Sequence, residues 1–156
     1  MSTSPAPFGL SEGLQLENLG LLLRWGAEAD ELRRSGGPTL VRNRLCWTDA
    51  VILGGLATRL DVWPDRPLAE IRIYPTVIDS ARDESEQFNR ALKEVTSRIG
   101  PPHKISQTES SLAQRLTYPK ASWSFEGITV QVAILEGMGA IYIPFFQMKI
   151  LHRSKS

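Results

Sequence analysis

The sequence contains almost no cysteine: among 156 residues, Cys46 is the only one. A single thiol cannot form an internal disulfide, and no group of Cys and His residues with zinc-site spacing accompanies it. We interpret Cys46 as a small strand residue. A nucleophilic pair with His103 is conceivable, but nothing in the sequence brings the two side chains together. We therefore expect no metal and no other cofactor.

Catalytic motifs are also lacking. His103 and His152 are the only histidines, and neither belongs to an HExxH or HxxxH spacing. The sequence has no GxSxG elbow, no P-loop and no GxGxxG loop, and the two glycines of "LGGL" are too few to hold a phosphate. Nothing marks two carboxylates as an acid–base couple. We expect that the chain is not an enzyme.

Long apolar runs and an excess of charge are missing as well. No stretch approaches the run of about 18 apolar residues that a membrane-spanning helix needs. The formal net charge is +1, which gives no general attraction to nucleic acid or to an anionic membrane. The first residues are rich in Ser, Pro and Gly and do not have the pattern of a secretory signal. We expect a cytoplasmic protein with a disordered lead-in at residues 1–18 and a flexible tail at residues 152–156.

What the sequence does contain is an internal repeat. Hydrophobic residues make up 42% of the chain, which fits one domain with its own core. Trp47 and Trp123 each stand five residues before the start of an apolar strand, at Ile52 and Ile128, and each follows a helix-like segment that ends in Gly-Pro. The period of about 76 residues is too long for a solenoid, so it indicates a duplicated module. We place the two units at about residues 19–78 and 79–151 of a single domain.

Each unit is predicted to be a helix followed by an antiparallel meander. The clearest helix runs from about residue 80 to 99, with apolar residues on one face; a shorter one lies within "AEADELRRSGG". The polar stretch "HKISQTESSLAQ" is expected to be a loop. A sheet with one apolar face must cover that face, and the helices are the available cover. The expected fold class is therefore α+β: two pseudo-repeated helix-plus-antiparallel-meander units forming one twisted sheet with both helices on one face.

Strand alternation assigns ten residues to the uncovered face of this sheet. They are rich in arginine and aromatic rings, the residue types that protein interfaces favour. These candidate partner-binding residues are Arg42, Arg44, Arg59, Asp61, Trp63, Glu70, Arg72, Tyr74, Gln131 and Tyr142. An ordinary outer face with cross-strand pairs such as Arg59–Glu70 or Asp61–Arg72 would show the same pattern.

Two further groups have a functional and a structural interpretation. The acidic residues Asp79, Asp83, Glu84 and Glu86 form a candidate binding patch, although they also complement the dipole of the long helix. Three tryptophans could line a ligand pocket between helix and sheet, but we interpret them as core residues. They are Trp25, Trp47 and Trp123.

The segments "LRWG", "GGP", "W…ILGG" and the pair "IRIYP" and "IYIPFF" together resemble small cytosolic immunity proteins of bacterial polymorphic toxin systems. The tandem helix-plus-meander layout is also similar to the beta-lactamase inhibitor protein type. None of these segments is a functional signature, so no binding residue carries over. The resemblance implies a protein that neutralises a cognate toxin, the C-terminal domain of an effector, by tight binding that occludes its active site.

The expected partner is therefore that toxin, bound by a monomer or in a 1:1 complex, with no nucleic acid and no membrane involved. A different class of function is a small-ligand or accessory module with a pocket between helices and sheet. A third is single-stranded nucleic acid on the arginine and aromatic face, against which the net charge of +1 argues.

Overall fold

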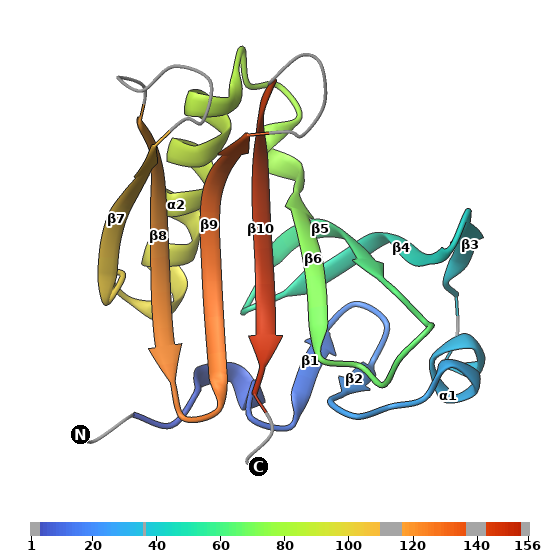
Figure 1. The fold of residues 1–156 in the computed structure, drawn as a ribbon. Helices are drawn as coiled ribbons and strands as arrows, with labels where there is room; N and C mark the ends of the chain where they lie inside the picture. The colour runs from blue at the N-terminus through green and yellow to red at the C-terminus, as the bar shows by residue number, and fades with distance from the viewer. Residues whose placement is uncertain (1–3, 36, 110–116, 137–142, 154–156) are drawn as a thin grey trace.

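The computed structural model describes residues 4–35, 37–109, 117–136 and 143–153, and an eight-stranded antiparallel sheet dominates it (Figure 1). A separate two-stranded hairpin consists of β1 (Gly13–Leu16) and β2 (Leu21–Arg24). The large sheet contains β3 (Thr39–Val41), β4 (Arg44–Ile52), β5 (Leu56–Val62), β6 (Glu70–Pro75), β7 (Lys104–Glu109), β8 (Thr117–Phe125), β9 (Ile128–Glu136) and β10 (Pro144–His152). The helices are α1 (Ala29–Arg34) and α2 (Glu84–Ile99), with short 3-10 turns η1 (Pro7–Gly9) and η2 (Thr76–Ile78).

The sheet is made of two four-stranded meanders joined at their last strands. The strand order is β3-β4-β5-β6-β10-β9-β8-β7, so β6 ends the first meander, β10 ends the second, and the two pair with each other. Trp47 lies on β4 and Trp123 on β8, the second strand of each meander, and both are at most 2% exposed. The strands thus repeat in the same order in both halves, and both tryptophans are core residues.

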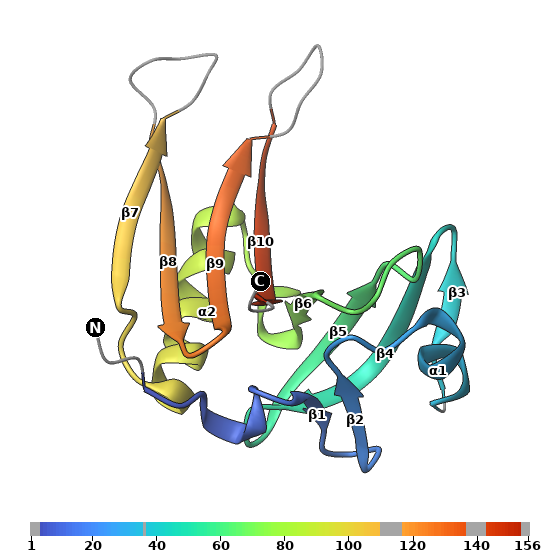
Figure 2. The same ribbon diagram turned by 60° about the horizontal axis from the view of Figure 1, so that its bottom comes forward.

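The expected arrangement of two helix-plus-meander units is nevertheless wrong. Among the described residues, α2 is the one helix longer than six residues. The six-residue α1 buries only Leu32, because four of its six residues are charged. Figure 2 shows α1 beside the β3 end of the sheet. A helix of fewer than two turns with one apolar contact cannot cover a meander.

The first meander is covered by the β1–β2 hairpin and the chain before it. Leu10, Leu14 and Leu16 are at most 1% exposed, so residues 4–18 are not the disordered lead-in that their composition predicted. The backbone N–H of Glu17 donates to the carbonyl of Val51, 2.7 Å away, and ties the hairpin to β4. Gly13 permits the tight pairing of the hairpin, because a Cβ there would lie 2.2 Å from the carbonyl oxygen of Leu23.

The second meander is covered by α2, the helix that its apolar periodicity predicted. Phe88, Ala91 and Val95 are at most 5% exposed and face β9 and β10. Asp83 caps the helix, since its carboxylate accepts from the N–H of Glu86 at 2.9 Å. The helix therefore begins at Glu84, four residues later than expected.

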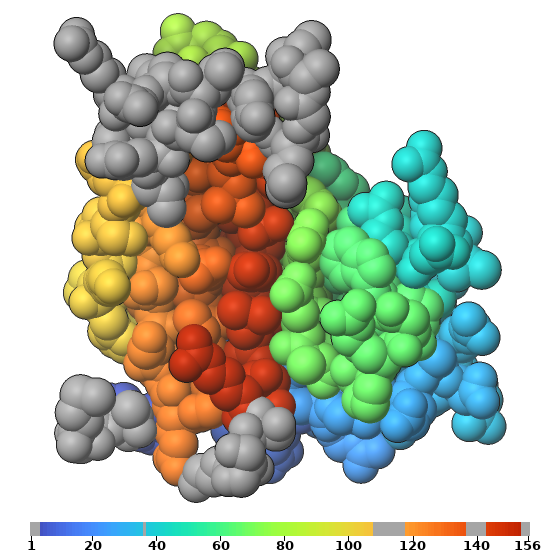
Figure 3. Space-filling model, viewed as in Figure 1, coloured from blue at the N-terminus to red at the C-terminus, as the bar shows by residue number. Residues whose placement is uncertain are grey.

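Both covers lie on the same face of the sheet. Leu60, Ile73 and Met148 are cross-strand neighbours on β5, β6 and β10, and all are at most 1% exposed within one continuous core. The residues next to them along the strands point to the opposite face. Figure 3 looks onto that face, where β8, β9, β10 and β6 lie side by side with α2 behind them (Figure 1). We call this surface the open face.

Candidate functional site

The register of the strands brings most of the predicted binding residues together on the open face. Seven of them lie on or directly after β4, β5 and β6, and we call these seven the Arg–aromatic patch. The patch consists of Arg44, Arg59, Asp61, Trp63, Glu70, Arg72 and Tyr74. Gln131 shares the open face but lies farther along, on β9, opposite Lys149. The predicted binding residues therefore gather mainly on the first meander.

Besides Gln131, two of the ten predicted residues are not part of this patch. Arg42 is exposed in the turn between β3 and β4, with a left-handed φ of 56°, and not on a strand as the alternation indicated. It lines a hollow that Pro64 and Trp63 also border. Tyr142 lies outside the described residues.

The carboxylate of Asp61 lies at the centre of the patch. Its Oδ2 accepts from the guanidinium of Arg44 at 2.8 Å, and its Oδ1 accepts from the thiol of Cys46 at 3.0 Å. The side chain of Asp61 is 13% exposed and that of Arg44 is 31% exposed. Asp61 therefore couples β4 to β5 through two partners that would otherwise be partly buried and unsatisfied.

Guanidinium groups lie over both aromatic rings of the patch. The Arg72 guanidinium is 4.7 Å from the ring centre of Trp63, and that of Arg59 is 5.9 Å from the ring centre of Tyr74. Such cation–π contacts favour a fixed orientation of ring and cation.

Each of these arginines also has a carboxylate partner, but not the partner that the cross-strand pattern indicated. Arg72 pairs with Glu70 at 3.2 Å on its own strand, and Arg59 pairs with Asp79 at 2.8 Å. The predicted Arg59–Glu70 and Asp61–Arg72 pairs do not occur among these ion pairs. The charges of the patch are therefore largely balanced internally, while the side chains of Arg59 and Arg72 remain 43% and 34% exposed.

The environment of Cys46 disfavours its reactive form. Burial raises the pKa of the thiol to about 11, and the hydrogen bond to Asp61 and its negative charge contribute to the rise. A thiol with this pKa is protonated at neutral pH and is a poor nucleophile. His103 precedes β7 at the far end of the strand order from β4, and its Nδ1 accepts from the N–H of Ser124. The structure therefore does not bring Cys46 and His103 together.

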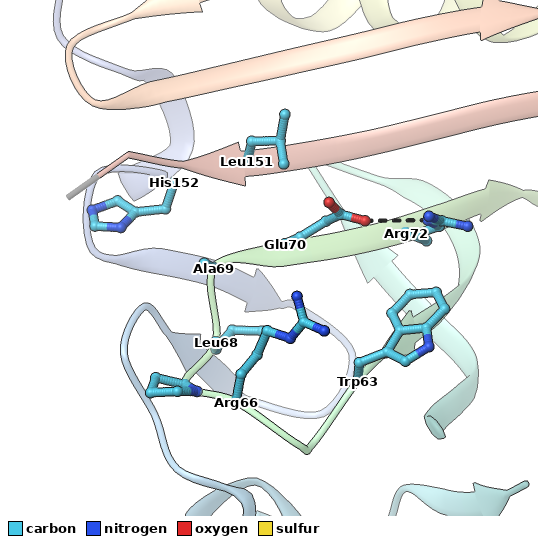
Figure 4. A pocket seen from close by; sticks show the side chains of 9 residues that line it. Trp63, Arg66, Leu68, Ala69, Glu70, Arg72, Leu151 and His152 are labelled. Atoms are coloured by element: carbon cyan, nitrogen blue, oxygen red, sulfur yellow. Dashed lines mark hydrogen bonds and ion pairs between the residues drawn. The ribbon is translucent and has the colours of Figure 1, made fainter. Parts of the chain in front are cut away.

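A hollow opens beside the patch, between β6 and the end of β10 (Figure 4). Trp63 and Arg72 line one side, and Arg66 points into it between Glu70 and Trp63. His152, expected in a flexible tail, is the last residue of β10 and stacks on Trp25, with ring centres 5.4 Å apart. The pairing of β10 with β9 continues through His152, which lies opposite Ile128, although apolar Leu151 followed by polar His152 breaks the alternation of the sequence there.

The sequence interpretation missed a group of lysines on the other half of the open face. Lys149 of β10 lies in one cross-strand row with Gln131, Ser122 and Lys104. Lys120 lies on β8, two residues before Ser122. The surface between β7 and β9 is hollowed, and we call this hollow, together with Lys149 at its border, the lysine groove. Its lining includes Lys104, Ser106, Lys120, Ser122, Ser124, Thr129, Gln131 and Arg153.

The lysine groove was missed because β7 was predicted to be a loop. The strand "KISQTE" has a single large apolar residue, Ile105, and that residue is 65% exposed. An edge strand needs little burial, so the usual alternation of apolar and polar residues is absent.

Three of the four residues of the acidic patch make internal contacts, and the fourth, Glu84, lies in the first turn of α2. Asp79 pairs with Arg59, Asp83 caps the helix, and Glu86 pairs with Arg82 and Arg90. These contacts fit the structural interpretation of the patch, in which the carboxylates stabilise the first turn of the helix.

Comparison with protein-family models, with curated proteins and with solved structures finds no match to this chain. Within the described ranges, no three or more His, Cys, Asp or Glu side chains are grouped as metal ligands would be. The helices described here are too short or too polar to cross a membrane.

Proposed function

We propose that this chain is an immunity or inhibitor protein that binds a cognate bacterial toxin through the open face and covers the toxin's active site. The observation that carries the proposal is the Arg–aromatic patch. Arginine, tryptophan and tyrosine dominate the binding energy of protein interfaces, and here they stand together on a rigid sheet. The resemblance of the sequence to immunity proteins adds the class of partner.

The contacts within the patch support tight binding. Trp63 and Tyr74 are flanked by guanidinium groups, and those guanidinium groups are held by carboxylates. A partner that docks on such side chains loses less conformational entropy than it would on mobile ones. The eight strands also offer room, since at about 4.8 Å spacing they span about 34 Å, the scale of an interface of about 800 Å² per partner.

The two other classes of function have less support. The space between α2 and the sheet is filled by Phe88, Ala91 and Val95, which leaves little volume for a small ligand there. Single-stranded nucleic acid needs free aromatic faces for base stacking. In the patch, two guanidinium groups lie near the ring of Trp63 and one lies near the ring of Tyr74, and a stacking base would have to compete with them.

The test is co-expression with the product of the gene directly upstream, which the proposal expects to carry the toxin domain. We expect a 1:1 complex and rescue of growth, measured by co-purification, by titration calorimetry and by plating. Trp63→Ala should weaken the complex by at least about 30-fold and Arg72→Ala by about tenfold, because each removes an anchor from the centre of the interface. Lys93→Ala is the matched control, since Lys93 is exposed on α2 at the back of the sheet. Absence of a complex, or full affinity in both patch variants, would refute the proposal.

A further inference from the structure

The positive charges on the two halves of the open face differ in their ion pairing. In the Arg–aromatic patch, Arg44, Arg59 and Arg72 each have a carboxylate partner within 3.2 Å. In the lysine groove, Lys104 and Lys120 form no ion pair with any described residue, and neither does Lys149. Among the described residues that line the groove, none is acidic. The groove therefore holds uncompensated positive charge in a molecule whose net charge is only +1.

The floor of the groove is suited to oxygen anions. Ser106, Ser122 and Ser124 have short side chains that keep the surface low between the longer lysines, and their hydroxyl groups can donate hydrogen bonds. The amide of Gln131 adds another donor. Arg153 extends the positive charge at one end of the groove.

The spacing of the charges fits an extended acidic peptide. Lys149 and Lys104 belong to one cross-strand row and are three strands apart, which is about 14 Å. In an extended chain, residues four positions apart are separated by about the same distance. Two carboxylates with that spacing, on a segment that crosses the strands, would reach both lysines at once.

We infer that the lysine groove receives a carboxylate-rich segment of the protein partner, beside the anchors of the Arg–aromatic patch. This inference rests on the proposed function in that the partner is a protein. Charge complementarity of this kind accelerates association and selects among partners. A single strand of nucleic acid fits less well, because the described lining of the groove holds one aromatic ring, that of Phe125, and this ring is partly buried against the core and in edge contact with His103.

The experiment uses the full chain and a fluorescein-labelled decaglutamate peptide at about 20 mM ionic strength, followed by fluorescence anisotropy. We expect decaglutamate to bind and decaglutamine not to bind. The combined variant Lys104→Glu, Lys120→Glu, Lys149→Glu should lose at least tenfold in affinity, and the control Lys93→Glu should lose less than twofold. Equal binding by the triple variant and the natural chain would overturn the inference. Tighter binding of a ten-nucleotide oligo(dT) at the same lysines would also overturn it, in favour of a phosphate site.

Two further measurements keep the result interpretable. The single variants Lys104→Gln, Lys120→Gln and Lys149→Gln should each weaken decaglutamate binding about two- to threefold, which tests the groove even if the triple variant does not fold. In the toxin complex, loss of binding with Trp63→Ala but not with the triple variant would refute the groove inference and leave the proposed function intact. Decaglutamate binding without any toxin complex would refute the proposed function alone.

Discussion

The two meanders of the sheet have the same connections but different surroundings. β3 to β6 are covered by a hairpin, and β7 to β10 are covered by α2. On the open face the first meander carries arginines paired with carboxylates, whereas the second carries lysines, set among serines, that form no ion pair with a described residue. The two halves thus share their strand order and an apolar buried face, and they differ in the element that covers this face and in the chemistry of the open face. Any apolar surface can serve as the cover, and the open face is free to acquire different chemistry in each half.

The largest effects are expected at the buried tryptophans, which occupy corresponding positions in the two meanders. Trp47→Ala and Trp123→Ala should each lower the free energy of unfolding by about 3–5 kcal/mol, because each empties a large volume in the core. Trp→Phe should separate the two sites. The indole N–H of Trp123 donates to the carbonyl of Gly100 at 2.7 Å, while that of Trp47 has no partner among the described residues. Trp123→Phe should therefore cost about 1 kcal/mol more than Trp47→Phe in urea denaturation. Equal costs would show that this hydrogen bond contributes nothing.

Removing the central carboxylate of the patch should have the next largest effect. Asp61→Asn leaves the partly buried Arg44 without its ion-pair partner and should cost about 1–2 kcal/mol in thermal or urea unfolding. Asp65→Asn is the matched control, because the Arg66–Asp65 pair is fully solvated and should contribute nothing measurable. If Asp61→Asn left the free energy of unfolding unchanged, the ion pairs would not be what holds the patch together.

The pKa of the Cys46 thiol depends on the carboxylate of Asp61, so a change at Asp61 can be followed by titrating the thiol. Since its folded pKa of about 11 lies above the ordinary value of 9.0, the folded state binds more protons than the unfolded state between these values. The stability that this group contributes is thus present below pH 9 and is lost as pH rises through 11. Asp61→Asn should lower the pKa of the thiol, though not to 9.0, because burial is the largest cause of the shift. The pH dependence of iodoacetamide alkylation measures this, and an unchanged profile would exclude a role for Asp61.

The two covers should loosen independently of each other. Asn18 holds the hairpin through bonds to the carbonyl of Asp49 and the N–H of Val51, at 3.0 and 2.9 Å, and Asp83 caps α2. Asn18→Ala and Asp83→Ala should each cost about 1 kcal/mol. Amide hydrogen exchange should rise in β1 and β2 for the first variant and in α2 for the second. Exchange rising in both covers for either variant would show that they unfold as one unit.

The smallest effect is expected in the lysine groove. Lys149→Gln should change the free energy of unfolding by less than about 0.5 kcal/mol, since the side chain has no partner to lose among the described residues. Arg72→Gln, one strand away in the same cross-strand row, should cost about 0.5–1 kcal/mol through loss of Glu70 and Trp63. The difference between these two changes in unfolding free energy measures how differently the two halves of the open face hold their cations. Equal changes would contradict the distinction between paired arginines and lysines without partners among the described residues.

Part of this arrangement could be predicted from the sequence. The alternation of β5 and β6 placed Arg59, Asp61 and Arg72 on one face correctly, because a buried opposite face fixes the register of a strand. The periodicity of α2 predicted the helix for a similar reason: a long amphipathic pattern has few alternative structures.

The remaining features could not be predicted, because they depend on contacts distant in the sequence. In the sequence, Leu10, Leu14 and Leu16 are separated by residues that are typical of loops. Their burial becomes favourable only through contact with the apolar face of β4 and β5. Arg59 pairs with Asp79, outside the sheet, which no cross-strand rule anticipates. The lysine groove lies on an edge strand, whose sequence carries no apolar pattern to reveal it.

The position of β10 has a consequence for how the protein is made. β10 comes last among the strands along the chain but lies fifth across the sheet, between β6 and β9. While the ribosome is still adding residues before 144, β6 and β9 each present an unpaired edge to other nascent chains. The sheet becomes continuous only when β10 pairs with both strands, and its pairing with β6 joins residues about 75 positions apart, which is expected to slow folding. In that interval the unpaired edges of β6 and β9 are the surfaces at which the chain is most prone to aggregate.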